Sequence, residues 1–269
     1  MPVRAISSSS NRYIKEYCRL ARSRKHRCNT GKLAIEGPHL LDEALAAGLP
    51  PEIVFFTSDF LESSGAKKAI SILPGGTRQY LLSPLLFSRL AATETPQEVA
   101  AIIPFNFPDL PAVIAKSLKL VLILDRLQDP GNMGTIVRTA SAAGVDALFY
   151  GPGTVDPYSP KALRSTAGAL FHLPLVAVEK PLQLVDQLRY SGMVIVAAQP
   201  QEGKIYWEND FRRKTALLIG SESRGLSPEL FAAADLAVFI PQHSPIDSLN
   251  AASAAAVLLY EALRQRSGP

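Results

Sequence analysis

A glycine-containing segment with a side-chain amide and a guanidinium close behind it follows one apolar run in the second half of the chain. Residues 125–134 read Asp-Arg-Leu-Gln-Asp-Pro-Gly-Asn-Met-Gly, and Arg138 stands four residues further on. The two glycines allow a tight turn that brings the backbone close to a ligand, and Asn132 can cap the helix that the following residues predict. A Pro-Gly turn with a helix cap and a surface arginine is the alternative interpretation.

Two further segments combine glycine or proline with polar side chains. Residues 219–225 read Ile-Gly-Ser-Glu-Ser-Arg-Gly, so backbone polar groups are exposed directly after an apolar run and Glu222 lies between two glycines. Residues 240–250 end in Ser-Leu-Asn at the start of an alanine-rich helix, with Ser248 and Asn250 as its polar residues. Helix capping alone would explain those two residues, but it leaves the Gly-Ser-Glu stretch unexplained.

Short apolar runs alternate with helical patterns over the second half of the chain. The expected strands are Leu118–Leu124, Ala147–Tyr150, Leu173–Val176, Val194–Ala198, Ala216–Ile219 and Leu236–Ile240, and a last helix is expected from Ser248 to Arg266. Nearly continuous apolar strands are buried on both faces, so the pattern predicts a parallel sheet with helices on each side. Ligands in such folds bind at the carboxyl ends of the strands, where the three polar segments lie.

The first 104 residues predict a smaller α/β unit. Its expected elements are a basic helix Asn11–Arg27, strand Leu33–Glu36, helix Pro38–Ala47, strands Ile53–Phe56 and Gln79–Leu82, helix Pro84–Leu90 and strand Val99–Ile103. Three prolines between residues 104 and 111 predict a linker over residues 105–117, because proline removes a hydrogen-bond donor and favours extended backbone before it. The second domain is then expected over residues 118–269.

Positive charge is concentrated at the N-terminus. The whole chain carries a net charge of +4, whereas residues 1–32 hold nine basic residues and one acid, or +8, which leaves −4 for the rest. The nine are Arg4, Arg12, Lys15, Arg19, Arg22, Arg24, Lys25, Arg27 and Lys32. A basic segment on a mildly acidic body predicts a phosphate-rich partner. A solvated helix face and an organelle transit peptide are the alternatives.

Composition excludes several classes of protein. With 47% hydrophobic and 19% charged residues over 269 residues, the chain is globular rather than disordered, and we find no apolar run long enough to span a membrane. Cys18 and Cys28 cannot form a disulfide framework, which favours a reducing, cytoplasmic compartment. The four histidines have no metal-ligand spacing, so no metal is expected. The dinucleotide fingerprint, the P-loop and the nucleophile elbow are missing from the sequence.

Three motifs taken together resemble the SpoU/TrmH branch of the SPOUT RNA methyltransferases. They are Asp129-Pro-x-Asn132-x-Gly134-x-x-x-Arg138, then Gly220-Ser-Glu222-x-x-Gly225-Leu226, then Ile240-Pro241 through Ser248-Leu249-Asn250 to Leu259-Tyr260-Glu261. Residues 32–48 are similar to the L30e-like substrate-binding domain often fused to this family. Residues 6–15 resemble the opening of the subgroup that acts on ribosomal RNA. Gln242, Ser244, Ala251 and Ala252 depart from the residues usual in the family.

The resemblance implies a fold, a reaction and an assembly. The fold would be a C-terminal parallel-sheet α/β domain with a deep trefoil knot, preceded by the small L30e-like α/β domain. The reaction would be transfer of a methyl group from S-adenosylmethionine to a ribose 2′-hydroxyl of RNA. The family also implies a homodimer packed through the knot region. Transfer RNA as the substrate, or a catalytically silent RNA-binding or ribosome-assembly factor on the same scaffold, are the alternatives to an enzyme acting on ribosomal RNA.

The resemblance also assigns roles to individual residues. The cofactor-binding positions are Gly220, Ile240 and Leu249, and the catalytic positions are Asn132, Arg138, Glu222, Ser248 and Asn250. Two physical roles for the arginine stay open. Buried beside the positive sulfonium of the cofactor, it could lose its proton and act as a base. Alternatively it stays charged, grips the adjacent phosphate and stabilises negative charge on the attacking oxygen.

Overall fold

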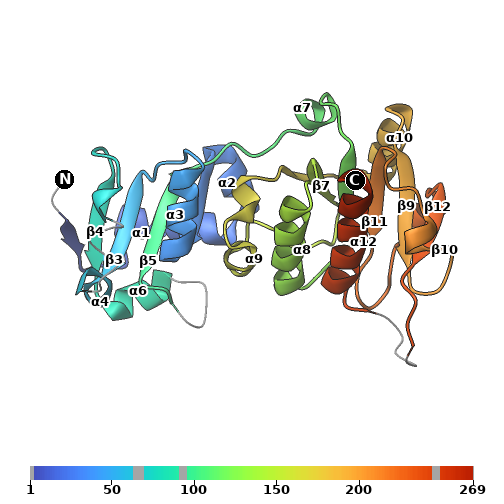
Figure 1. Ribbon diagram of the computed structural model, residues 1–269. Coiled ribbons are helices and arrows are strands. Elements are labelled where there is room, and N and C mark those ends of the chain that lie inside the picture. Colours follow the sequence, from blue (N-terminus) through green and yellow to red (C-terminus); the bar gives the residue numbers. More distant parts are fainter. Residues whose placement is uncertain (1–2, 63–69, 91–95, 244–248, 269) are drawn as a thin grey trace. The chain divides into compact units, whose positions relative to one another are not determined.

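The computed structural model describes residues 3–62, 70–90, 96–243 and 249–268 (Figure 1). The chain separates into two compact units. The first unit comprises Met1–Phe107 and Asp156–Phe171, and the second comprises Pro108–Val155 and His172–Pro269. Within the described residues, no helix is both long enough and apolar enough to cross a membrane.

The second unit contains a sheet of seven strands that are all parallel to their neighbours. In spatial order these are β10 (Lys204–Ile205), β12 (Leu236–Phe239), β9 (Val194–Gln199), β11 (Thr215–Ile219), β6 (Leu120–Leu124), β7 (Ala147–Tyr150) and β8 (Leu175–Ala177). All five residues of β6 and of β11 are buried, which confirms the prediction of a parallel sheet from continuous apolar runs. The short edge strand β10 was not expected.

Helices pack on both sides of this sheet. One face is covered by α7 (Leu110–Ile114), α10 (Pro181–Tyr190) and α11 (Pro228–Ala232), whose apolar side chains join those of the strands in one buried cluster. On the other side, α8 (Pro130–Ala142) and α12 (Ala251–Arg266) pack against each other (Figure 1). The doubly covered sheet is the arrangement that the sequence pattern predicts.

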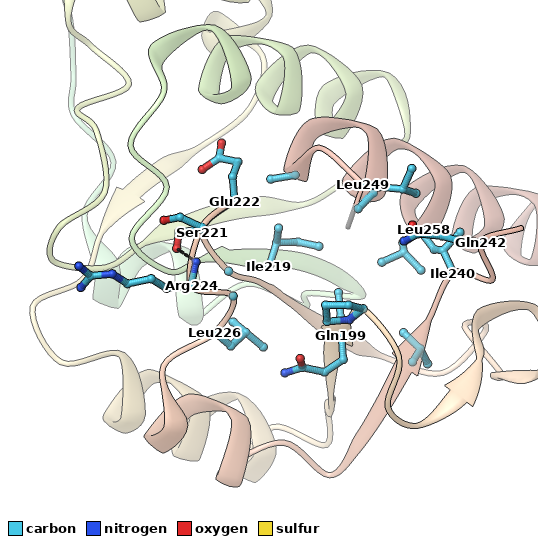
Figure 2. A pocket seen from close by; sticks show the side chains of 18 residues that line it. Gln199, Ile219, Ser221, Glu222, Arg224, Leu226, Ile240, Gln242, Leu249 and Leu258 are labelled. Atoms are coloured by element: carbon cyan, nitrogen blue, oxygen red, sulfur yellow. Dashed lines mark hydrogen bonds between the residues drawn. The ribbon is translucent and has the colours of Figure 1, made fainter. Parts of the chain in front are cut away.

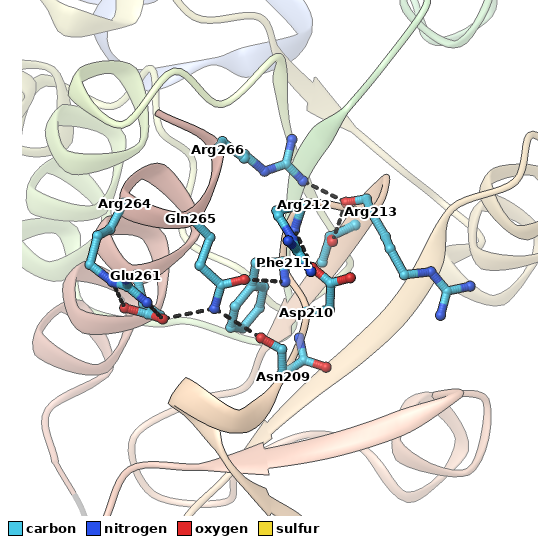
Figure 3. Close-up of polar contacts among 10 residues, drawn as sticks. Asn209, Asp210, Phe211, Arg212, Arg213, Glu261, Arg264, Gln265 and Arg266 are labelled. Carbon is cyan, nitrogen blue, oxygen red and sulfur yellow. Dashed lines mark hydrogen bonds and ion pairs between the residues drawn. The ribbon is translucent and has the colours of Figure 1, made fainter. Parts of the chain in front are cut away.

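The C-terminal end of α12 is fixed to the segment that leads into β11 (Figure 3). The side chain of Gln265 accepts a hydrogen bond from the backbone N–H of Phe211 at 2.8 Å and donates to the carbonyl of Asn209 at 2.9 Å. Gln265 also donates to Glu261, which is paired with Arg264 at 2.7 Å. One glutamine thus satisfies backbone groups around the buried ring of Phe211 and holds the helix in place.

The first unit has a five-stranded mixed sheet. Its order is β1 (Arg4–Ile6), β4 (Arg78–Leu82), β3 (Ile53–Thr57), β5 (Val99–Pro104) and β2 (Lys32–Glu36), with β5 antiparallel to both of its neighbours. Among its described residues are the helices α1 (Arg12–Arg22), α2 (Arg24–Thr30), α3 (Pro38–Ala46), α4 (Ser58–Glu62), α6 (Pro84–Leu90) and α9 (Pro160–Thr166), the last ending next to a 3-10 turn η1 (Ala169–Phe171). α1 and α6 share a buried cluster with one face of the sheet.

The basic helix expected over residues 11–27 is interrupted at Ser23. This residue has extended backbone, with φ −123° and ψ 106°, and its hydroxyl accepts a hydrogen bond from the backbone N–H of His26. It therefore ends α1 and caps α2. The prediction of one continuous helix was wrong, because a serine that can cap a helix start competes with helix continuation.

Arg27 is an internal residue of the first unit rather than a surface cation. It is buried, forms an ion pair with Asp156, and donates to the carbonyl of Leu20 at 2.6 Å. Its partner Asp156 is the first residue of the segment Asp156–Phe171, which also belongs to the first unit. In the sequence that segment lies between two stretches of the second unit, and α7 is a short helix before β6.

Candidate functional site

The carboxyl ends of neighbouring parallel strands bring the polar segments together. β12, β9, β11 and β6 are consecutive in the sheet, so the residues that follow them lie along one edge. The N–H of Asp125 donates to the carbonyl of Ile219 at 2.9 Å, and the buried Asp125 carboxylate accepts from the N–H of Ser227 at 2.6 Å. The segments after β6 and β11 are thereby tied to each other.

The segment after β11 is a tight turn that only glycine can start. Ser221 and Gly225 exchange two backbone hydrogen bonds of 3.1 and 2.9 Å. A Cβ atom on Gly220 would lie 2.0 Å from the carbonyl carbon of Gly225 and 2.2 Å from the nitrogen of Leu226. Because both contacts are to backbone, no side chain is compatible with this turn.

A cavity of about 590 Å³ opens beside this turn (Figure 2). Its apolar wall consists of Ile219, Leu226, Val238, Ile240, Leu249 and Leu258, and its polar groups include Glu222 and the backbone around Gly220. The volume and the mixture of aliphatic walls with a few polar groups are typical of a small-molecule site. All three expected cofactor positions therefore line one cavity.

Three of the expected catalytic side chains form a connected set beside the cavity. The amide nitrogen of Asn132 donates to the carboxylate of Glu222, and the amide nitrogen of Asn250 donates to the amide oxygen of Asn132 at 3.0 Å. We call these residues the polar triad. The oxygen of Asn250 also accepts from the N–H groups of Ala252 and Ser253, which caps α12. These bonds fix the orientation of both amides and of the carboxylate.

The expectation that Asn132 caps α8 was wrong. The helix begins at Pro130, and the capping side chain is that of Asp129, which accepts from the N–H of Asn132 at 2.7 Å. Aspartate followed by proline is a favourable helix start, because proline needs no hydrogen-bond acceptor there. The amide of Asn132 is consequently available for Glu222 and Asn250.

The remaining expected positions differ in their placement. Arg138 is exposed on α8 and is not part of the cavity wall. Among the described residues, none forms a hydrogen bond or an ion pair with its side chain. Ser248 and Ser244 lie outside the described residues, whereas Gln242 lines the cavity.

Sequence reasoning missed Asp125 and the segment after β9 as parts of the site. Gln199 and Pro200 line the cavity, and Asp125 ties the segment after β6 to the segment after β11, which lines the cavity. The signals were present in the sequence, because an acid directly follows one apolar run and Gln-Pro directly follows another. Over the described part of the chain, no group of three or more potential metal ligands is found.

Two models of known protein families match this chain. The pattern of the SpoU rRNA Methylase family matches residues 119–260, more than half of the chain and the range that forms the cavity. The chain belongs to the SpoU rRNA methylase family. The MRM3-like substrate binding domain matches residues 11–101. The resemblance drawn from the three sequence motifs is confirmed.

Several members of the family match this chain over nearly their whole length. The 23S rRNA (guanosine(2553)-2′-O)-methyltransferase RlmP of Bacillus subtilis (strain 168) is 36% identical over 259 residues, which are 96% of this chain and 98% of that protein. The 23S rRNA (uridine(2479)-2′-O)-methyltransferase of Streptomyces viridochromogenes is 32% identical over 265 residues, 96% and 92% of the two chains.

A solved structure shows the same fold in this family. The crystal structure of the SpoU methyltransferase AviRb from Streptomyces viridochromogenes in complex with the cofactor AdoMet has a TM-score of 0.84 at 32% identity, covering 96% of this chain and 98% of that one. The predicted fold class, a parallel-sheet α/β domain preceded by a small α/β domain, is confirmed. The trefoil knot stays a prediction, because residues 244–248 lie outside the described part of the segment where it is expected.

Proposed function

We propose that this protein methylates a ribose 2′-hydroxyl of ribosomal RNA with S-adenosylmethionine as the methyl donor. The observation that carries the proposal is the cavity at the strand ends, which is lined by the second and third motif segments and bordered by the polar triad, to which the first motif segment contributes Asn132. Family membership and relatives named as 23S rRNA 2′-O-methyltransferases support it.

The residues that form the cavity fit S-adenosylmethionine. Its aliphatic wall suits an adenine ring, and the turn at Gly220 leaves backbone N–H and C=O groups next to the open space. When bound, the cofactor supplies a methyl group on a positively charged sulfonium. We assign its binding to Gly220, Ile240 and Leu249, with Asp125 holding the surrounding segments together.

The polar triad has a positioning role in this proposal. Glu222 is held at the cavity wall by Asn132, which is held in turn by Asn250. Side chains that are locked before the substrate arrives orient a ribose hydroxyl without further reorganisation, and such positioning contributes several kcal/mol to catalysis in favourable cases. Ser248 is assigned to the same set on the family motif alone.

Arg138 acts as a clamp on the substrate rather than as a base. Its side chain is exposed and has no carboxylate partner among the described residues. Exposure removes the burial that would favour loss of its proton, and a charged guanidinium can bind a phosphate with two parallel hydrogen bonds. The role that fits is therefore to hold the phosphate next to the reacting ribose and to stabilise charge on its oxygen.

The same proposal includes a homodimer, a knot and a cytoplasmic location. The alanine-rich start of α12 permits close packing, and Tyr260 on the same helix is 52% exposed, which supports a partner protomer at this helix. Both cysteines are free thiols, which supports a reducing compartment.

In this proposal residues 1–104 bind the substrate RNA, residues 105–117 connect the domains, and residues 118–269 carry the methyltransferase site.

The test is methyl transfer to defined RNAs. The protein would be incubated with S-adenosylmethionine labelled on the methyl group and with free ribosomal RNA, ribosomal subunits or transfer RNA. We expect label in ribosomal RNA or its particle, at one position that resists alkaline hydrolysis because its 2′-oxygen is methylated. Label confined to transfer RNA, or label on a base, would contradict the proposal.

A further inference from the structure

α1 presents a face made of cations only. Its buried face carries Ile14, Tyr17, Leu20 and Ala21, which pack on the sheet of the first unit. The exposed face carries Arg12, Lys15, Arg19 and Arg22. At about 100° per residue these four cations lie within an arc of roughly 80°, over about 15 Å of helix.

This charge is not neutralised locally. The one acid in α1 is Glu16, which contacts His26 at 3.0 Å. None of the four cations pairs with a carboxylate among the described residues. In the second unit, by contrast, Arg189, Arg212 and Arg264 all have carboxylate partners within 3.1 Å.

Two arginines of the sheet extend this face at the start of α1. Arg4 on β1 is the register partner of Tyr80 on β4, and Arg78 precedes that tyrosine by two residues, so all three lie on the same side of the sheet. The ring of Tyr80 is 5.2 Å from that of Tyr13 on α1, and the guanidinium of Arg78 is 5.6 Å from the Tyr13 ring.

Arg12 and Arg78 both affect the pKa of the Tyr13 hydroxyl. The hydrogen bond from Arg12 lowers the pKa of the Tyr13 hydroxyl below its ordinary value, and the nearby charge of Arg78 acts in the same direction. A lowered pKa means that the surroundings favour negative charge. The guanidinium groups of Arg12 and Arg78 therefore place positive charge around this ring and its hydroxyl.

We propose that the α1 face binds the sugar-phosphate backbone of the substrate RNA without regard to base sequence. The face comprises Arg4, Arg12, Lys15, Arg19, Arg22 and Arg78. Its length covers several phosphates, and its exposed side chains are charged, with no apolar group that could insert into a membrane. The proposal rests on the proposed function for the identity of the RNA. It excludes Arg27 and Lys32, which pair with Asp156 and Glu52.

The test replaces the three exposed cations of α1 that contact no aromatic ring. Lys15→Gln, Arg19→Gln and Arg22→Gln are combined, because glutamine keeps the helix propensity and removes the charge. The matched control combines Arg89→Gln, Lys116→Gln and Lys180→Gln, which remove the same charge from exposed positions elsewhere. RNA affinity is measured by fluorescence anisotropy over a salt series, and methyl transfer by initial rates.

We expect the α1 variant to bind ribosomal RNA at least about tenfold more weakly, with a salt slope reduced by roughly 2–3, since each phosphate contact contributes 0.7–0.9. KM for RNA should rise while kcat at saturating RNA and the affinity for S-adenosylmethionine stay unchanged. The control should match the original protein. The proposal would be overturned by an unchanged RNA affinity and salt slope in the α1 variant, or by an equal loss in the control. It would also be overturned if the α1 variant kept its RNA affinity and lost binding to an acidic protein instead. Failure of methyl transfer by the original protein would reject the proposed function and leave this binding comparison intact.

Discussion

The two units place their functional residues in opposite ways. In the second unit, the site is concentrated where four parallel strands end, and the side chains of the polar triad hold one another through hydrogen bonds. In the first unit, exposed cations are spread along α1 and the edge of the sheet, with no carboxylate partners among the described residues. A reaction needs fixed geometry, whereas backbone recognition needs only charge at a suitable spacing.

This difference predicts how each unit responds to substitution. Single changes at the strand ends should be severe, because they alter the geometry of one small cavity. Single changes on α1 should be mild and additive, because each cation contributes one of several phosphate contacts. Three substitutions examine the site at the strand ends, and a fourth examines the anchored end of α12.

Arg138→Ala should have the largest effect. Loss of the clamp should reduce kcat by roughly 10²–10³-fold, since one charge-stabilising group is removed. The affinity for S-adenosylmethionine should be retained, because Arg138 is not part of the cavity wall. Arg138→Lys should recover only part of the rate, since lysine lacks the bidentate fork. Initial rates and equilibrium dialysis measure both, and full turnover by Arg138→Ala would refute the assignment.

Gly220→Ala should have the second largest effect. A methyl group there would overlap the backbone of Gly225 and Leu226, so the turn must move and deform the cavity. Overpacking of this kind costs about 1–3 kcal/mol, or roughly a ten- to hundredfold loss of cofactor affinity. Gly75→Ala is the control, because its methyl group would meet nothing within 4 Å. Equal cofactor affinity in the two variants would place the cofactor elsewhere.

Asn132→Ala should have a smaller effect on the rate. Glu222 and Asn250 would lose the side chain that connects them, and we expect kcat to fall by roughly tenfold to a hundredfold through misplacement of the reacting groups. Gln128→Ala, at an exposed position in the same segment, is the control. Unchanged rate and RNA binding in Asn132→Ala would show that the polar triad does not position the substrate.

Gln265→Ala should affect stability more than chemistry. The substitution leaves the N–H of Phe211 and the carbonyl of Asn209 without their partner, at a cost of about 1–3 kcal/mol in the free energy of unfolding. Urea denaturation measures this change, with the exposed Gln187→Ala on α10 as control. A loss of activity without a loss of stability would mean that this end of α12 takes part in the site.

The strands and the cavity residues were accessible from sequence because their signals are local. Continuous apolar runs gave β6, β7, β9 and β11 to within two residues, and the glycines marked the turn after β11. β1 and β10 were missed because they have only three and two residues. The cap of α8 was assigned to Asn132 although the Asp-Pro pair before it is the better start.

Long-range contacts were not accessible in this way. The segment Asp156–Phe171 joins the first unit through contacts that include α9 against β2 and the ion pair of Asp156 with Arg27, 129 residues earlier in the chain. Because of the same ion pair, Arg27 is buried and does not belong to the exposed N-terminal cations that the sequence indicates. Neither residue type nor spacing predicts such a pair, because a charged residue in a basic helix is normally exposed.

The most direct test of the account is calorimetric titration of the purified protein with S-adenosylmethionine. We expect saturable binding at one site per chain, weakened in Gly220→Ala and unchanged in Arg138→Ala. Absence of binding by the original protein, or binding that is indifferent to Gly220→Ala, would contradict the claim that the end of β9 and the segments after β11 and β12 enclose the site of the methyl donor.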